Sequence, residues 1–129
     1  MPSTRVLSVG QCSLDHGMIS RTLEHAFDVR VQSAAATDDA LEKLRSEPFD
    51  LVLVNRILDR DGSSGLDLIR AIKADPELAE VPVMLVSNYG DAQADAVAIG
   101  ALRGFGKVEL REPATRDRIA EVLNPTRPG

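Results

Sequence analysis

The stretch FDLVLVNRILDRDGSSGLDLIRAIK, residues 49–73, passes from a short apolar segment through a polar loop into a helical pattern. Residues 51–54 (LVLV) contain no polar break, and such a run is typical of a strand that is buried on both faces. Asn55 ends the run, and a serine at position 63 or 64 can cap the helix that follows. A buried strand, a loop and a helix in this order form the repeating unit of parallel α/β sheets.

Strand and helix patterns alternate along the rest of the chain. Apolar or alternating runs predict strands, and apolar residues at helical spacing predict the helices between them. The strands are expected over residues 5–9, 29–34, 50–55, 83–87 and 104–107. The helices are expected over residues 14–27, 37–46, 66–72, 91–101 and 115–123. Thr37 is the expected N-cap of the second helix, and Gly100 is expected to end the fourth.

Five strands that alternate with five helices predict an α/β fold, a doubly wound (βα)5 domain with a parallel sheet. The commonest small version, the flavodoxin-like sheet, has the strand order 2-1-3-4-5. Its ligand crevice lies outside the carboxyl ends of the strands, where strands 1 and 3 diverge. We expect the domain to span residues 1–124, with residues 125–129 as a frayed tail.

Composition and charge narrow the class of protein. The chain has 129 residues, 43% of them hydrophobic and 27% charged, which fits one globular domain. Its formal net charge of −5 argues against a general nucleic-acid or anionic-membrane surface. A single cysteine, Cys12, and an N-terminus without the apolar stretch of a signal peptide favour a cytoplasmic protein.

Five residues follow the ends of the central strands and form the candidate site. They are Gly10, Gln11, Asn55, Ser87 and Lys107. Asn55 can satisfy backbone groups at the strand end, and Ser87 can cap the loop after strand 4. Lys107, the last residue of the expected fifth strand, needs a partner in that position.

Three acids are the expected partners of this lysine. We favour an ion pair between Lys107 and Asp15, Asp59 or Asp61.

The chain resembles the receiver domain of two-component response regulators over nearly its whole length, through FDLVLVN (49–55), DGSSGLDLIRAIKADPELAEVPVMLVS (61–87) and IGALRGFGK (99–107). In that family an aspartate after strand 3 accepts a phosphoryl group from a histidine kinase. Two acids after strand 1 hold Mg²⁺ with it. A Ser or Thr after strand 4 and a Lys after strand 5 contact the phosphoryl group, and the resemblance assigns these roles to Ser87 and Lys107.

The resemblance fails at the centre of the site. It puts Asn55 at the phosphoacceptor position and Gly10 and Gln11 at the acidic pair. Gly104 stands at the aromatic switch position, and Val108 replaces the proline that normally follows the lysine. An amide is a poor nucleophile, and Mg²⁺ prefers carboxylate ligands, so we expect neither phosphorylation nor metal binding.

The resemblance and its departures together predict an atypical receiver, or pseudo-receiver. We expect a phosphorylation-independent protein–protein interaction module that is not an enzyme and uses no metal or other cofactor. The partner would be a signalling protein or a second copy, bound through the fourth helix, fifth strand and fifth helix. That face would include Arg103, Phe105, Arg111, Arg116 and Arg118. Phe105 would anchor it if exposed, but it can equally face the core, with the arginines as solvated surface.

Two other functions stay open. Asp59 or Asp61, in the loop beyond strand 3, could serve as a displaced phosphoacceptor. A flavin or nucleotide protein on the same fold would need a phosphate-cradling loop after strand 1. The segment GQCSLDHG (10–17) has no dense run of Gly, Ser and Thr, and the chain has no Trp and one Tyr to stack on a ring.

Overall fold

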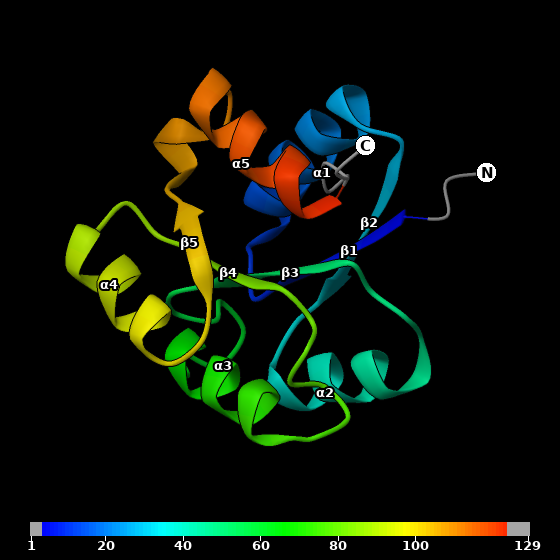
Figure 1. Cartoon of the computed structure of the whole chain (residues 1–129), viewed down its shortest axis with the longest axis vertical. Helices are drawn as coiled ribbons and strands as arrows, with labels where there is room; N and C mark the ends of the chain where they lie inside the picture. Colours follow the sequence, from blue (N-terminus) through cyan, green and yellow to red (C-terminus); the bar gives the residue numbers. More distant parts are fainter. Residues whose placement is uncertain (1–3, 124–129) are drawn as a thin grey trace, which may run out of the picture.

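The computed structural model describes residues 4–123, which form a five-stranded parallel sheet between two layers of helices (Figure 1). The strands are β1 (Thr4–Val9), β2 (Val29–Ala34), β3 (Leu51–Asn55), β4 (Val83–Val86) and β5 (Leu102–Phe105). The helices are α1 (Ser13–Ala26), α2 (Thr37–Ser46), α3 (Gly65–Ala74), α4 (Gly90–Ala98) and α5 (Pro113–Leu123). A 3-10 helix, η1 (Lys107–Glu109), lies between β5 and α5. The strand order is β2-β1-β3-β4-β5, so the predicted fold class and topology are confirmed.

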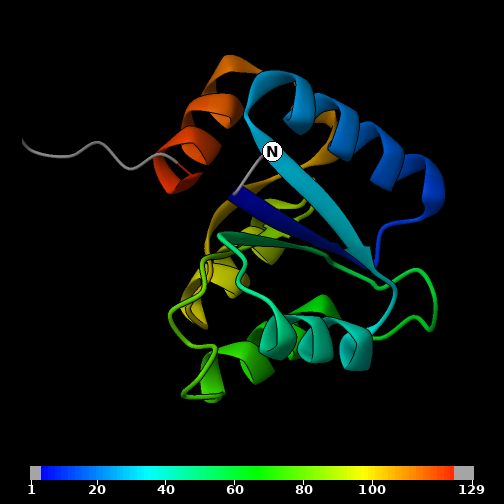
Figure 2. The ribbon, with the colours of Figure 1, turned by 90° about the vertical axis from the view of Figure 1, so that its right-hand side faces the viewer.

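Each face of the sheet has its own hydrophobic core. Helices α1 and α5 cover one face, and α2, α3 and α4 cover the other (Figure 2). Strand β3 contributes to both cores: Leu51 and Leu53 point to one, and Val52 and Val54 to the other. All four side chains are fully buried, as the unbroken apolar run predicts.

Strand β2 is an edge strand, and its burial alternates along the chain. Val29 and Val31 are buried, whereas Arg30 between them is exposed. One face of this strand packs on α1, and the other is open to water at Arg30 but is covered at Ala34, which is buried in the core under α2. The wetter pattern of residues 29–34 therefore marks an edge, as predicted.

Helix ends follow the expected residues with one exception. The Ser64 hydroxyl accepts a hydrogen bond from the Leu66 amide at 3.2 Å and caps α3. Gly100 adopts a φ of 111° just after α4, a conformation that favours glycine. The prediction for Thr37 is wrong, because Ala36 is the N-cap of α2 and Thr37 is the first helical residue.

Strand β5 begins and ends two residues earlier than predicted. It pairs with β4 through Met84–Leu102 and Val86–Phe105, with a register shift between these pairs. Phe105 is fully buried and takes part in the α1–α5 core, which sets the position of the strand. Lys107 therefore lies in η1 and is not the last residue of a strand.

No helix within residues 4–123 is long and apolar enough to cross a membrane. The longest of them, α1, has 14 residues, against about 20 for a bilayer-spanning helix. The predicted tail at residues 125–129 lies outside the described part of the chain.

Candidate functional site

A pocket of about 230 Å³ opens at the carboxyl ends of β3 and β4. Three of the five predicted site residues line it: Asn55, Ser87 and Lys107. Gly10 joins them through a hydrogen bond to Asn55, and Gln11 is not among the lining residues. We call this cavity the strand-end pocket.

Asn55 uses its amide nitrogen to connect two backbone segments. The Nδ2 group donates to the Gly10 carbonyl at 3.1 Å and to the Ile57 carbonyl at 2.8 Å. These bonds tie the end of β1 to the loop after β3. A carboxylate at position 55 has no proton to donate and would face two carbonyl oxygens.

Gly10 occupies a position that excludes other residues. Its φ is +75°, in the left-handed region. A Cβ at this position would lie 2.9 Å from the Leu58 Cα and closer still to the Leu58 side chain, which is fully buried. The Gly10 carbonyl also accepts from the Asp59 amide at 2.9 Å. The loop is therefore packed directly on Gly10, and an acidic side chain does not fit there without moving it.

Sequence reasoning did not identify Leu58 as part of the site. The sequence alone does not single it out, because Ile57 and Leu58 stand together before the charged loop DRDG, yet only Leu58 is buried and Ile57 is 42% exposed. The neighbouring Gln11 supplies only a neutral amide, whose oxygen and nitrogen are both buried without a hydrogen-bond partner. Within residues 4–123, His, Cys, Asp and Glu form no cluster of three or more that could hold a metal ion.

Lys107 pairs with Asp15 of α1. The Lys107 Nζ and the Asp15 Oδ2 are 2.6 Å apart, and both side chains are about one-quarter exposed, at 28% and 24%. The hydrogen bond from Lys107 holds the pKa of Asp15 below its usual value of 3.8. Of the three acids proposed as partners, the structure selects Asp15.

The other two candidate partners, Asp59 and Asp61, lie in the loop between β3 and α3 and do not pair with Lys107. The Asp61 carboxylate accepts from the amide and hydroxyl of Ser63, and these bonds lower its pKa. Asp59 is exposed, and neither acid lines the strand-end pocket.

Ser87 caps the loop that leads into α4. Its hydroxyl accepts from the Tyr89 amide at 3.1 Å, and the residue is 8% exposed. The ring of Tyr89 in turn stacks under the Arg56 guanidinium, 5.1 Å from the ring centroid. Arg56 and Lys107 are the charged residues that line the pocket, and no carboxylate of the described chain lines it.

A buried glutamine, Gln93, contacts Gly104, the residue that the sequence resemblance puts at the aromatic switch position. Gln93 of α4 donates to the carbonyls of Leu85 and Ser87 and accepts from the Gly104 amide, at 2.9–3.1 Å. A Cβ on Gly104 would overlap the Leu85 carbonyl, so no aromatic ring can stand there. The Gly104 carbonyl accepts from Arg118 at 2.9 Å. Sequence reasoning missed Gln93, although a glutamine in an Ala-rich helix is a visible signal.

The predicted interaction face has a different composition from the one expected. Phe105 is fully buried, so it faces the core and is not an anchor. Exposed apolar residues at α4 and β5 are Tyr89, Val97 and Leu102, with exposed fractions of 60%, 47% and 44%, and Val108 of η1 is exposed as well. The register shift in β5 brings Leu102 to the surface, which the sequence pattern alone does not show.

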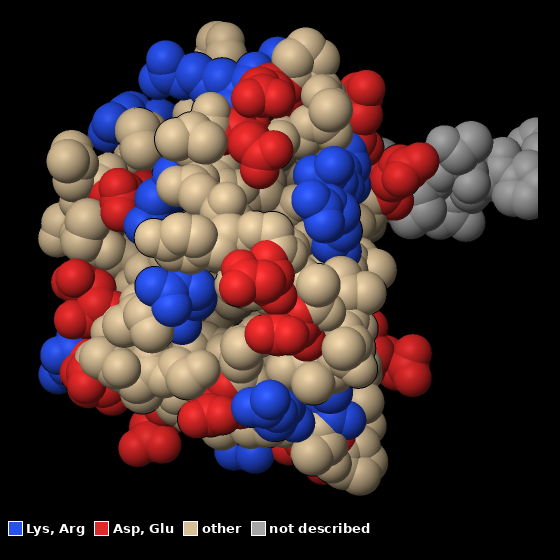
Figure 3. All heavy atoms as spheres, turned by 90° about the vertical axis from the view of Figure 1, so that its left-hand side faces the viewer, with Lys and Arg blue, Asp and Glu red and all other residues tan. Residues whose placement is uncertain are grey.

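The four predicted arginines divide between two surfaces, and Arg118 contacts β5 through its hydrogen bond to the Gly104 carbonyl. Arg103 stays on the α4–β5 side, where acidic and basic groups are interspersed with uncharged surface (Figure 3). Arg111 and Arg116 instead line a groove between α1 and α5.

Comparisons with known proteins identify the family. The model of the response regulator receiver domain matches residues 14–109. Chemotaxis protein CheY of Pseudomonas aeruginosa is 32% identical over 99 residues, which cover 74% of this chain and 76% of CheY. The transcriptional regulatory protein ZraR of Salmonella typhimurium is 27% identical over 111 residues. That match covers 85% of this chain but 23% of ZraR, so the chain spans about a quarter of that regulator.

Solved structures share the fold. The signal receiver domain of a DNA-binding response regulator from Colwellia psychrerythraea superposes with a TM-score of 0.79 at 23% identity, covering 94% of this chain and 98% of that one. A response regulator from Burkholderia pseudomallei, solved with a phosphorylated aspartic acid, superposes with a TM-score of 0.71 at 22% identity. It covers 95% of this chain and 68% of that one.

Proposed function

The chain belongs to the response regulator receiver family, and we propose that it acts as a protein-binding signalling module that does not depend on phosphorylation. The observation that carries this proposal is the role of the Asn55 amide, which donates to two backbone carbonyls. Phosphoryl transfer at this position needs an anionic oxygen that is free to attack. Asn55 has no such oxygen, and its hydrogen bonds serve the structure of the loop.

The surroundings of Asn55 support the same conclusion. Phosphoryl transfer also needs a cation to offset the charge that develops on the phosphate. Leu58 packs where a side chain on Gly10 would stand, and the charged residues that line the pocket are Arg56 and Lys107. Asp15 pairs with Lys107, so the charge of Arg56 is left uncompensated in a pocket that no described carboxylate lines, and this disfavours Mg²⁺. We therefore propose that the domain works without metal or cofactor and is not an enzyme.

The hydrogen bonds of Gln93 connect the strand-end pocket to the α4–β5 side, and we propose that they hold this region in one conformation. Gln93 holds β4, β5 and the start of α4 together, and Gly104 leaves no room for a moving aromatic ring. A buried, fully bonded network of this kind favours one arrangement. We propose that Tyr89, Val97 and Leu102 present a constant surface to a signalling partner or a second copy.

Intact-mass spectrometry tests this function. The protein is incubated with phosphoramidate and Mg²⁺, and we expect its mass to stay unchanged. The matched control is the double variant Asp59→Asn/Asp61→Asn. A phosphoryl adduct on the parent that the double variant lacks would overturn the proposal and identify a displaced phosphoacceptor in the loop. An adduct on both proteins would equally overturn it.

A further inference from the structure

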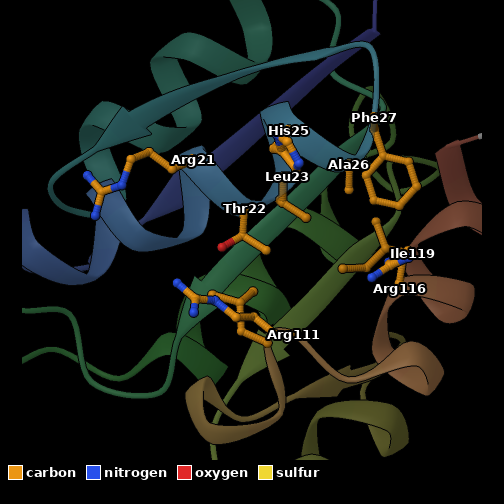
Figure 4. Close-up of a pocket in the computed structure, with 10 residues that line it drawn as sticks. Arg21, Thr22, Leu23, His25, Ala26, Phe27, Arg111, Arg116 and Ile119 are labelled. Atoms are coloured by element: carbon orange, nitrogen blue, oxygen red, sulfur yellow. The ribbon is translucent and has the colours of Figure 1, made fainter.

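A groove of about 340 Å³ separates the second half of α1 from the start of α5 (Figure 4). It shares no lining residue with the strand-end pocket. The groove takes no part in the function proposed above, and its chemistry does not depend on Asn55.

The floor of the groove is apolar and continuous with a core. Leu23, Leu110 and Ile119 are at most 5% exposed and belong to the core between the sheet and the α1–α5 layer. Phe27, at the end of α1, packs against the same core and is partly exposed. An apolar side chain that entered the groove would extend this core and leave water.

The rim of the groove is basic. Arg21, Arg111 and Arg116 line it, and all three are exposed. None of the three forms an ion pair with a carboxylate within residues 4–123, and no acid is among the residues that line the groove. Within the described chain, three guanidinium groups without an ion-pair partner therefore stand beside an apolar floor, in a protein whose net charge is −5.

We propose that this groove binds an acidic amphipathic segment of another protein. Apolar side chains of the segment would occupy the floor, and its carboxylates would pair with the arginines of the rim. Arg–carboxylate pairs are often bidentate, which would orient the segment in the groove. An α-helix about 10–12 Å across would fill 340 Å³ in less than one turn, so its backbone lies over the groove and only side chains enter.

The charge of the whole chain favours a short acidic segment over an extended polyanion. A bilayer or a nucleic acid meets many acidic groups of a protein with net charge −5. A short segment senses mainly charges within one Debye length, about 8–10 Å, and near the groove these include the three arginines.

The experiment uses a defined peptide, because the partner is not identified. The probe is a short fluorescein-labelled peptide of Glu and Leu, with Leu at the i, i+3, i+4, i+7 spacing of one helical face. We expect a saturable rise in fluorescence anisotropy with the parent protein. The double variant Arg111→Glu/Arg116→Glu should bind about tenfold more weakly, because two attractions become repulsions. The matched control, Arg60→Glu/Arg70→Glu, changes the net charge equally at exposed sites outside the groove and should bind like the parent.

A second variant tests the apolar floor without changing charge. Ala26 is exposed in the last turn of α1 and lines the groove, so Ala26→Phe should fill the space and weaken binding while the fold is kept. Amide chemical-shift changes in the parent should fall on α1 and α5 when the peptide is added.

Four outcomes would overturn the proposal. The first is that the acidic peptide does not bind. The second is equal binding of a peptide with Lys in place of Glu, or equal weakening by the control variant. The third is binding of phosphatidylserine vesicles that the peptide does not displace, which would indicate a lipid surface. The fourth is self-association of the parent that Arg111→Glu/Arg116→Glu abolishes, which would indicate a second copy. The peptide assay does not measure phosphorylation, so a negative result would leave the function proposed for the strand-end pocket unaffected.

Discussion

The β1–β3 side of the strand-end pocket and its β4–β5 side depart from the family pattern in different ways. On the β1–β3 side the resemblance leads one to expect acids at the positions where the chain has Gly10, Gln11 and Asn55. On the β4–β5 side Ser87 and Lys107 are the residue types that the resemblance implies. Yet Ser87 caps a loop and Lys107 pairs with Asp15, so both are occupied by structural contacts. The comparison teaches that a retained residue type does not establish a retained role.

The largest expected effect concerns the β1–β3 side. Gly10→Asp should lower the free energy of unfolding by about 2–5 kcal/mol, because it combines a left-handed backbone with overlap on Leu58. Urea unfolding measures the change. Gly62→Asp is the matched control, since Gly62 has a φ of +72° but a Cβ added there would have no atom within 4 Å. The control should cost about 1–2 kcal/mol from the backbone alone. If both variants lost the same free energy of unfolding, Leu58 would not be what prevents a side chain at position 10.

The next effect concerns the β4–β5 side. Gln93→Leu should lower the free energy of unfolding by about 2–4 kcal/mol, because two carbonyls and the Gly104 amide would be left without this partner in a buried place. The matched control is Asp95→Leu, which places the same side chain at an exposed position of α4 and should be nearly neutral. Thermal or urea unfolding compares the two. A neutral Gln93→Leu would mean that β4, β5 and α4 are held by packing alone.

Asn55→Asp should have a smaller effect. It replaces a donor by a carboxylate that faces the Gly10 and Ile57 carbonyls, and we expect a loss of about 1–3 kcal/mol at neutral pH. Asn55→Ala removes the donor without adding charge and should cost less. Melting curves with and without Mg²⁺ check both variants. If Mg²⁺ specifically raised the Tm of the aspartate variant, the strand-end pocket would bind the metal, contrary to our proposal.

The smallest effect concerns the Lys107–Asp15 pair. Asp15→Asn should cost about 0.5–1 kcal/mol at neutral pH, since the pair is partly exposed and screened by solvent. The folded state lowers the pKa of Asp15, so this stability is present above the unfolded value near 3.8 and is lost as the pH falls through the folded value. The parent and the variant should therefore converge in acid. A double-mutant cycle with Lys107→Gln isolates the pair, and a coupling that persists at low pH would assign the effect to packing.

The fold was predictable from the chain because its signals are local. The LVLV run of β3 and the alternating pattern of β2 reflect burial on two faces or on one, and both predictions hold. The boundaries of β5 were not predictable in this way. They depend on which residue of β5 pairs with Val86 of β4, and that pairing follows from where Phe105 meets the α1–α5 core.

Three of the five members of the candidate site and the kind of contact that each makes were predictable, but the exact partners were not. Topology alone brings the ends of β1, β3 and β4 to one edge of the sheet, which is why Asn55 and Ser87 share a pocket. The pairing of Lys107 with Asp15 joins residues 92 positions apart in the chain. Such a contact depends on how η1 and α1 lie in space, and no spacing in the sequence encodes it.

The sequence by itself determined the topology, the family and the residue types at each strand end, because these depend on periodicity and on position along the chain. Only the tertiary structure decided what those residues do. It placed Leu58 against Gly10, gave the Asn55 amide two carbonyls to bind, buried Phe105 and left three arginines around an apolar groove. The physical reason is that hydrogen bonds, ion pairs and steric overlap act over a few ångström, between segments that only folding brings together.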